Sequence, residues 1–273
     1  MTLGGAVAIG LAALAAALGA ALFRSRQSYV RARARLGAAS AELERLEHAF
    51  ARFAPMELVE RVIASGVPTG GERKDVTVLF ADLVDFTPIS ERVDPSDLVR
   101  ILNGYFERMS RAITAHQGHI STLIGDGILA LFGALEANPW QTNDAVRAAL
   151  AMRSELAAYN AELAAASLPK LALSVGLHRG SGIVGLVGSP ELMQFTVVGT
   201  VVTIAARVQS LTREHGVDIL LTSEVQRALD PRFALRSLPP RALKGISEPV
   251  SILALLEQEA EVGRIGAAQS GTR

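Results

Sequence analysis

The residues that point most directly to chemistry are two aspartates, each placed beside predicted β-strands. The apolar, β-rich run 76–81 predicts a buried strand, and Asp82 follows it directly. Asp126 stands between Gly125 and Gly127, which join two short apolar runs and predict a hairpin turn. Carboxylate oxygens are the ligands that Mg²⁺ prefers, and the ion commonly shares them with substrate phosphates. Because aspartate is also frequent in turns for its own hydrogen bonds, a purely structural role stays open at this point.

Strands and helices must position these carboxylates. The apolar runs 119–124 and 128–132 predict the two strands of the hairpin. Asp94 and Pro95 supply the N-cap and first-turn proline of a helix, with its apolar residues on one face. We expect Gly118 to end that helix. A second, alanine-rich helix over 144–166 has one apolar face and is predicted to pack in the core.

A glycine-rich segment, 180–185, matches the dinucleotide-binding fingerprint GxGxxG after a predicted strand. No amphipathic helix opens there, and no acidic residue lies about twenty residues beyond Gly185, as that fingerprint requires. We therefore expect a hairpin turn at these glycines. The histidines at 116, 119, 178 and 215 lack the spacing of metal ligands and are expected to be ordinary polar or partly buried residues.

Composition narrows the function classes. The 27 Lys and Arg residues match the 27 Asp and Glu residues, so no global positive field attracts nucleic acid, and no nucleic-acid partner is expected. The absence of cysteine excludes disulfides, thiolate metal sites and a cysteine nucleophile. Any bound metal must therefore use oxygen or imidazole ligands.

The N-terminal stretch 1–23 carries no charged side chain and is long enough to cross a hydrocarbon core, which predicts a single-pass transmembrane anchor. A signal peptide or a peripheral helix is the alternative, because the stretch is rich in alanine and glycine. Arginines follow at once, at 24, 26, 31, 33 and 35. Positively charged residues beside a membrane span stay on its cytoplasmic side. We therefore expect an inner or plasma membrane protein with its catalytic domain in the cytoplasm.

Heptad spacing predicts a coiled-coil signalling helix over 24–54, and a single amphipathic helix is the alternative. A coupling helix and linker, 55–71, would follow because Pro55 ends the heptads. We expect a catalytic domain over 72–257 and a flexible tail over 258–273.

Longer segments around the two aspartates make the functional prediction specific. VLFADLVDFT at 78–87 and IGDGILALFG at 124–133 resemble the two metal motifs of class III adenylate and guanylate cyclases, with the aspartates 44 residues apart. Further segments resemble, in order, that family's central strand, base-reading segment, transition-state helix and phosphate-binding lysine: 173–180, 195–199, 205–207 and 243–245. The resemblance covers residues 74–256, in the manner of a bacterial, membrane-anchored member.

The resemblance implies an α+β fold, a ferredoxin-like class III nucleotide cyclase catalytic domain on a mostly antiparallel sheet. It also implies a homodimer with interfacial active sites, ATP or GTP as substrate, and two Mg²⁺ or Mn²⁺ ions per site. Asp82, Asp126 and the carbonyl of Leu83 would bind the metals. The remaining implied site residues are Phe86 and Thr87 for the terminal phosphates, Thr122 and Thr196 for the base, and Thr203, Arg207 and Lys244 for the reacting phosphates, Arg207 coming from the partner subunit.

Three positions depart from the family pattern. Thr122 replaces a lysine that commonly contacts the purine, Thr203 replaces an asparagine, and Asp85 replaces the glycine of the phosphate loop. The carboxylate of Asp85 would repel a triphosphate unless it points away. Thr196 fits the adenylate pattern, so the expected function is an adenylate cyclase that forms cyclic AMP and pyrophosphate. A guanylate cyclase, or an impaired domain that relays signals by binding nucleotide or by dimerising, is the alternative.

Overall fold

The computed structural model describes residues 70–189 and 192–256, together with helical positions scattered between 22 and 45. The chain divides into two units, Met1–Glu60 and Arg61–Arg273. The predicted anchor lies outside the described residues except for Leu22, as do most of the coupling segment and the whole tail. Within the part of the chain that is described, no helix combines the length and apolar character needed to cross a membrane. The coiled coil stays a prediction, and its described positions are helical.

The second unit is built on an eight-stranded sheet in the order β2-β3-β1-β4-β6-β8-β7, with β5 paired to the end of β4. Its central pair is β1 with β4, which run antiparallel from Glu72 opposite Val184 to Leu83 opposite Leu173. Among the described strands, only β4 and β6 pair in parallel. The mostly antiparallel sheet is therefore confirmed. The strands are β1 Glu72–Leu83, β2 His119–Ile124, β3 Gly127–Phe132, β4 Leu173–Ser189, β5 Leu192–Val198, β6 Ile219–Thr222, β7 Leu235–Ser237 and β8 Ile252–Leu255.

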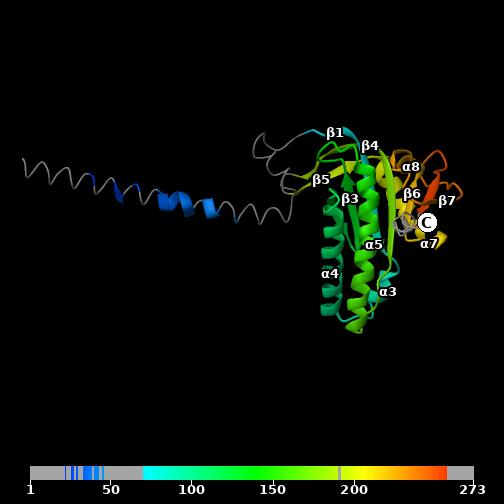
Figure 1. Cartoon of the computed structure of the whole chain (residues 1–273), viewed down its shortest axis with the longest axis horizontal. Helices are drawn as coiled ribbons and strands as arrows, with labels where there is room; N and C mark the ends of the chain where they lie inside the picture. The colour runs from blue at the N-terminus through cyan, green and yellow to red at the C-terminus, as the bar shows by residue number, and fades with distance from the viewer. Residues whose placement is uncertain are drawn as a thin grey trace, which may run out of the picture. The chain divides into compact units, whose positions relative to one another are not determined.

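Helices cover both faces of this sheet, and α4 and α5 lie side by side against one of them (Figure 1). Ile219 and Leu221 of β6 belong to the apolar core on that face. Leu220, between them, packs with Val208 of α6 on the opposite face, as the alternation of side chains along a strand requires. The helices are α3 Phe86–Ser90, α4 Pro95–Thr114, α5 Gln141–Ala165, α6 Thr200–Ser210, α7 Thr212–His215 and α8 Ser223–Ala228.

The predicted start of α4 is confirmed. The carboxylate of Asp94 accepts a hydrogen bond from the backbone N–H of Ser96 at 2.9 Å, and Pro95 is the first helical residue. The helix ends at Thr114, and Gln117, with a φ of 59°, adopts the left-handed conformation before Gly118. The chain then turns into β2, which places the hairpin of β2 and β3 beside β1.

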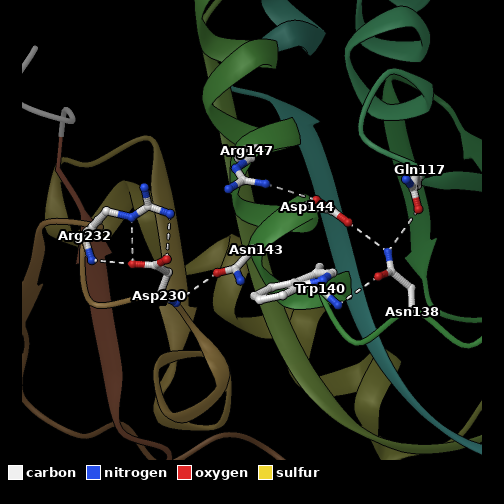
Figure 2. A network of polar contacts seen from close by, with 8 residues as sticks. All are labelled: Gln117, Asn138, Trp140, Asn143, Asp144, Arg147, Asp230 and Arg232. Carbon is white, nitrogen blue, oxygen red and sulfur yellow. Dashed lines mark hydrogen bonds and ion pairs between the residues drawn. The ribbon is translucent and has the colours of Figure 1, made fainter. Parts of the chain in front are cut away.

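Helix α5 starts three residues before the predicted 144, and Figure 2 shows the polar contacts around its start. The side chain of Asn138 accepts a hydrogen bond from the backbone N–H of Trp140 and donates one to Asp144, both at 2.8 Å. Asn143 accepts one from the backbone N–H of Asp230 in the loop after α8. Apolar periodicity missed this start because polar, buried residues form it.

The glycine-rich segment 180–185 is not a hairpin turn, which corrects our expectation. It lies inside β4, and the chain reverses only after Ser189, where β4 pairs with β5. A β-carbon at Gly182 would lie 2.3 Å from the Val197 side chain, so glycine serves here to admit a close neighbour rather than to turn the chain.

Gly176 of β4 sets the position of α6. A β-carbon there would lie 2.3 Å from the backbone nitrogen of Gln209 and 2.4 Å from the carbonyl oxygen of Ala205, so the helix packs backbone against backbone on the strand. The side chain of Gln209 then donates to the hydroxyl of Ser174, which donates to the carbonyl oxygen of Asp82 at 3.0 Å. Helix α6 is thereby linked directly to the end of β1.

Candidate active site

The two predicted metal carboxylates lie together. Asp82 is the penultimate residue of β1, and Asp126 occupies the turn between β2 and β3, where Gly125 adopts a φ of 62°. The backbone N–H of Leu83 donates a hydrogen bond to Oδ2 of Asp126 at 3.3 Å. Residues 43 positions apart in the chain are thus joined at the end of the central strand β1.

Burial and a nearby negative charge raise the pKa of Asp82. Burial, and then the neighbouring Asp126 carboxylate, raise the pKa of Asp82 from 3.8 to about 6, while Arg213 acts in the opposite direction. A carboxylate held partly out of water beside a second one favours a proton or a cation. The pair therefore has the electrostatic character of a cation site.

The donor set fits a hard divalent ion. Two carboxylates converge, and within the part of the chain that the structure covers no group of three or more His, Cys, Asp or Glu side chains could hold a metal. The remaining ligands would have to be backbone carbonyls, water or substrate phosphates. Mg²⁺ is usually bound in this way, through one or two carboxylates and the phosphates of its substrate.

Helix α3 begins with Phe86 and Thr87, the predicted phosphate contacts, three residues after the end of β1. Asp85, which precedes them, adopts the left-handed conformation with a φ of 51°, which explains why a glycine suits this position. The side chain of Asp85 lies 3.3 Å from Nη1 of Arg213 on α7. The repulsion expected from this carboxylate is therefore offset by an arginine 128 residues further along the chain.

The two predicted base-reading residues lie on neighbouring strands. Thr122 is in β2 and Thr196 in β5, and the hydroxyl of Ser121 donates to the carbonyl oxygen of Phe195 between these strands at 2.9 Å. Gln194 also reaches across and donates to the hydroxyl of Thr122. Sequence reasoning missed Gln194, although its place two residues before Thr196, on the same side of the strand, was a usable signal.

The residues predicted to contact the reacting phosphates lie on other elements than the carboxylates. Thr203 and Arg207 are one turn apart on α6, and Lys244 is exposed in the connection between β7 and β8. Among the described residues, no hydrogen bond or ion pair joins Arg207 or Lys244 to Asp82 or Asp126. Among the residues that the structure describes, the buried Nε atom of Arg207 has no hydrogen-bond partner. A second chain or a ligand would satisfy it.

A buried tyrosine adjoins the carboxylate pair and was not foreseen as part of the site. Tyr105, on the inner face of α4, is fully buried, and its hydroxyl has no hydrogen-bond partner among the described residues. Burial, and then the charges of Asp82 and Asp126, raise the pKa of Tyr105, so its hydroxyl stays protonated beside them. Sequence patterning had assigned Tyr105 only to the apolar face of the helix.

Comparison with known proteins agrees with this geometry. A family model described as the adenylate and guanylate cyclase catalytic domain matches residues 70–255. Adenylate cyclase 1 of Rhizobium meliloti (strain 1021) is 34% identical over 206 residues, which cover 74% of this chain and 31% of that protein. The adenylate cyclase of Anabaena cylindrica is 32% identical over 222 residues, which cover 77% and 43%. The chain thus spans less than half the length of these relatives.

Solved structures of both nucleotide specificities are similar to this fold. The guanylyl cyclase Cya2 superposes with a TM-score of 0.64 at 32% identity, covering 71% of this chain and 98% of that one. The adenylyl cyclase CyaB from P. aeruginosa superposes with a TM-score of 0.66 at 27% identity, covering 71% and 99%. The fold is therefore shared by a guanylyl cyclase and an adenylyl cyclase, which differ in the nucleotide base of their substrates.

Proposed function

Because this chain belongs to the adenylate and guanylate cyclase catalytic domain family, we propose that it is an adenylate cyclase, which converts ATP to cyclic AMP and pyrophosphate. The observation that carries the proposal is the convergence of Asp82 and Asp126 at the end of β1. Such a pair suits the chemistry of a nucleoside triphosphate, whose charge must be neutralised while one phosphorus atom is attacked.

In the proposed reaction the 3′-hydroxyl of ATP gives its proton to water and bonds to the α-phosphorus. The bond from that phosphorus to the oxygen bridging the β-phosphate breaks, and pyrophosphate leaves. Members of this family generally use two Mg²⁺ or Mn²⁺ ions, which, when bound, would neutralise charge on the attacking and leaving oxygens. Asp82, Asp126 and the carbonyl of Leu83 would hold them.

The chain's own cations would act on the phosphates. Arg207, with its planar fork of donors, suits the charge that develops on the α-phosphoryl group, and its buried Nε has no partner among the described residues. Lys244 would act as a point charge, Thr203 would add a hydroxyl donor, and the amides of Phe86 and Thr87 would orient the terminal phosphates. These roles remain proposals.

A homodimer would bring Arg207 of one subunit to the carboxylates of the other. Support comes from exposed apolar side chains on β2, β4 and β5, since exposed apolar patches mark interaction surfaces. Leu192 and Ile124 are 77% and 55% exposed. The others are Leu123, Ile183, Val187, Met193 and Val198.

GTP is the second candidate substrate. Thr196 favours ATP, but Thr122 replaces the lysine, and Gln194 already occupies the Thr122 hydroxyl. The similarity to the guanylyl cyclase Cya2 also keeps this alternative open. Incubating the full chain with Mn²⁺ and an equal mixture of ATP and GTP, and measuring product masses, decides between them. Cyclic AMP in excess supports the proposal, and cyclic GTP in excess supports the alternative.

We also propose that residues 1–23 anchor the protein in the inner or plasma membrane, with the catalytic domain in the cytoplasm. The uncharged stretch and the arginines after it support this arrangement. Fractionation of cells that express the chain with a C-terminal tag provides the test. Tagged protein in the membrane fraction, accessible only from the cytoplasmic side, is expected, and fully released protein would contradict the anchor.

A further inference from the structure

An ion pair lies at the edge of the proposed triphosphate site. Nη1 of Arg213, on α7, is 3.3 Å from Oδ1 of Asp85, and the two side chains are 52% and 74% exposed. Asp85 directly precedes Phe86 and Thr87, and it follows Asp82 by three residues. In the sequence, Asp85 therefore lies between the metal carboxylate and the residues assigned to the terminal phosphates.

The charge of Arg213 reaches the carboxylate pair itself. It lowers the pKa of Asp82, against the effects of burial and of Asp126. Arg213 is paired with Asp85, three residues after Asp82, and it belongs to the same chain as those carboxylates. Arg207, by contrast, makes no hydrogen bond or ion pair with either carboxylate in the described chain.

The energetics favour exchange of partners. An exposed ion pair contributes little because water and salt screen both charges, so opening this one costs little. A guanidinium matches phosphate oxygens with two parallel hydrogen bonds, and a triphosphate carries several negative charges. A free Asp85 carboxylate gains full hydration, since its side chain already lies mostly in solvent.

We propose that Arg213 binds the terminal phosphates of the nucleoside triphosphate by exchanging its partner Asp85, so that Asp85 competes with the substrate for this arginine. The inference rests on the proposed function, because it takes a nucleoside triphosphate as the ligand. Arg213 thereby raises affinity for the triphosphate, and Asp85 holds Arg213 in position while lowering that affinity.

If Asp85 competes with the triphosphate for Arg213, substitutions at these two residues should have non-additive effects on the affinity for the triphosphate. Arg213→Gln should weaken binding about tenfold, which is the effect of losing one charge-assisted contact. Asp85→Asn should tighten binding about threefold, since Arg213 no longer has to leave a partner. In the Asp85→Asn background, Arg213→Gln should cost more than in the wild type. A role limited to neutralising Asp85 predicts the opposite, because the arginine would then be dispensable.

The test is a calorimetric titration of the full chain with 3′-deoxy-ATP and Mg²⁺, because this nucleotide cannot be cyclised. The same titration with 3′-deoxy-AMP, which has no terminal phosphates, should show no dependence on Arg213. Arg111→Gln breaks an ion pair of similar length, with Glu155 at 3.4 Å, and removes an arginine of similar exposure; it is the control that should bind like the wild type.

The outcomes separate this inference from the proposed function. Unchanged binding by Arg213→Gln, an effect that vanishes in the Asp85→Asn background, or a wild-type chain that binds no triphosphate would each overturn the inference. The expected shifts in a chain that makes no cyclic product would uphold the inference and refute the cyclase proposal. If the wild type forms cyclic product and Arg213→Gln binds the nucleotide as tightly as the wild type, the cyclase proposal is upheld and this inference is refuted.

Discussion

The backbone N–H of Leu83 donates a hydrogen bond to the carboxylate of Asp126 at 3.3 Å. This bond ties the turn between β2 and β3 to the last residue of β1, so the carboxylates of Asp82 and Asp126 are brought together by the fold itself. A pre-formed pair of like charges costs stability until a cation or proton arrives. The first predictions follow from that cost.

Replacing Asp82 by asparagine should stabilise the metal-free protein at pH 7.5. The pKa of Asp82 is raised in the folded state from 3.8 to about 6, so the fold disfavours the ionised form. Below pH 4 the side chain is protonated in both states and the cost is absent. The cost appears as pH rises from about 4 to 6 and persists above. Thermal unfolding in EDTA at pH 7.5 and pH 4.5 should show an advantage of Asp82→Asn that shrinks at the lower pH.

Mn²⁺ should reverse this order of stability. The ion should raise the unfolding temperature of the wild type at pH 7.5 and have little effect on Asp82→Asn, because binding to the native state stabilises it. Equal stabilisation of both proteins by Mn²⁺ would show that the ion binds elsewhere.

Metal affinity should fall at acid pH. Below the raised pKa of Asp82, at about 6, a proton competes with the ion for the same oxygens, so the apparent affinity should fall by up to about tenfold per pH unit. Titration of the protein with Mn²⁺ by electron paramagnetic resonance between pH 5 and 8 measures this dependence. An affinity that stays constant down to pH 5 would speak against Asp82 as a ligand.

A lysine at position 122 should raise the preference for ATP. The long lysine side chain carries a donor further than the Thr122 hydroxyl reaches, and adenine N1 accepts a hydrogen bond whereas guanine N1 donates one. We expect Thr122→Lys to raise the ratio of kcat/KM for ATP to that for GTP by about tenfold, the effect of one charge-assisted hydrogen bond. Steady-state kinetics with both nucleotides measures this ratio, and Thr122→Val is the control without a donor. An unchanged ratio would remove Thr122 from the base site.

An alanine at position 176 should damage both stability and activity. Its β-carbon would lie 2.3 Å from the backbone nitrogen of Gln209, so α6 must shift, at a cost of about 1–3 kcal/mol in the free energy of unfolding. The shift also displaces Arg207 on that helix. Urea unfolding and turnover of the same samples test both effects. Gly70→Ala is the control, because a β-carbon there meets nothing within 4 Å.

Local patterns in the sequence were sufficient for several elements. Asp94 and Pro95 predicted the start of α4, because capping depends on neighbours in the chain. The glycines around Asp126 predicted the β2–β3 turn for the same reason. The resemblance to a known family then assigned roles to Asp82 and Asp126, which composition and spacing alone left open.

Patterns in the sequence could not predict the contacts between segments that are distant in the chain. The glycines of β4 suggested a turn, yet their function is to admit Val197 and the backbone of α6, which no local pattern records. Gln194 and Thr122 are 72 residues apart, and Asp85 and Arg213 still further. Charged residues on a surface have many possible partners, so only the folded arrangement identifies the one that is used.

We propose that Asp82 and Asp126 of one chain and Arg207 of another together form a cyclase site. Co-expressing Asp82→Asn and Arg207→Ala chains with different affinity tags, and purifying over both tags, isolates heterodimers with one intact site of two. Cyclic AMP formation should be about half that of the wild-type dimer, while each variant homodimer is inactive. Heterodimers no more active than the variant homodimers, or full activity of either variant alone, would contradict the claim.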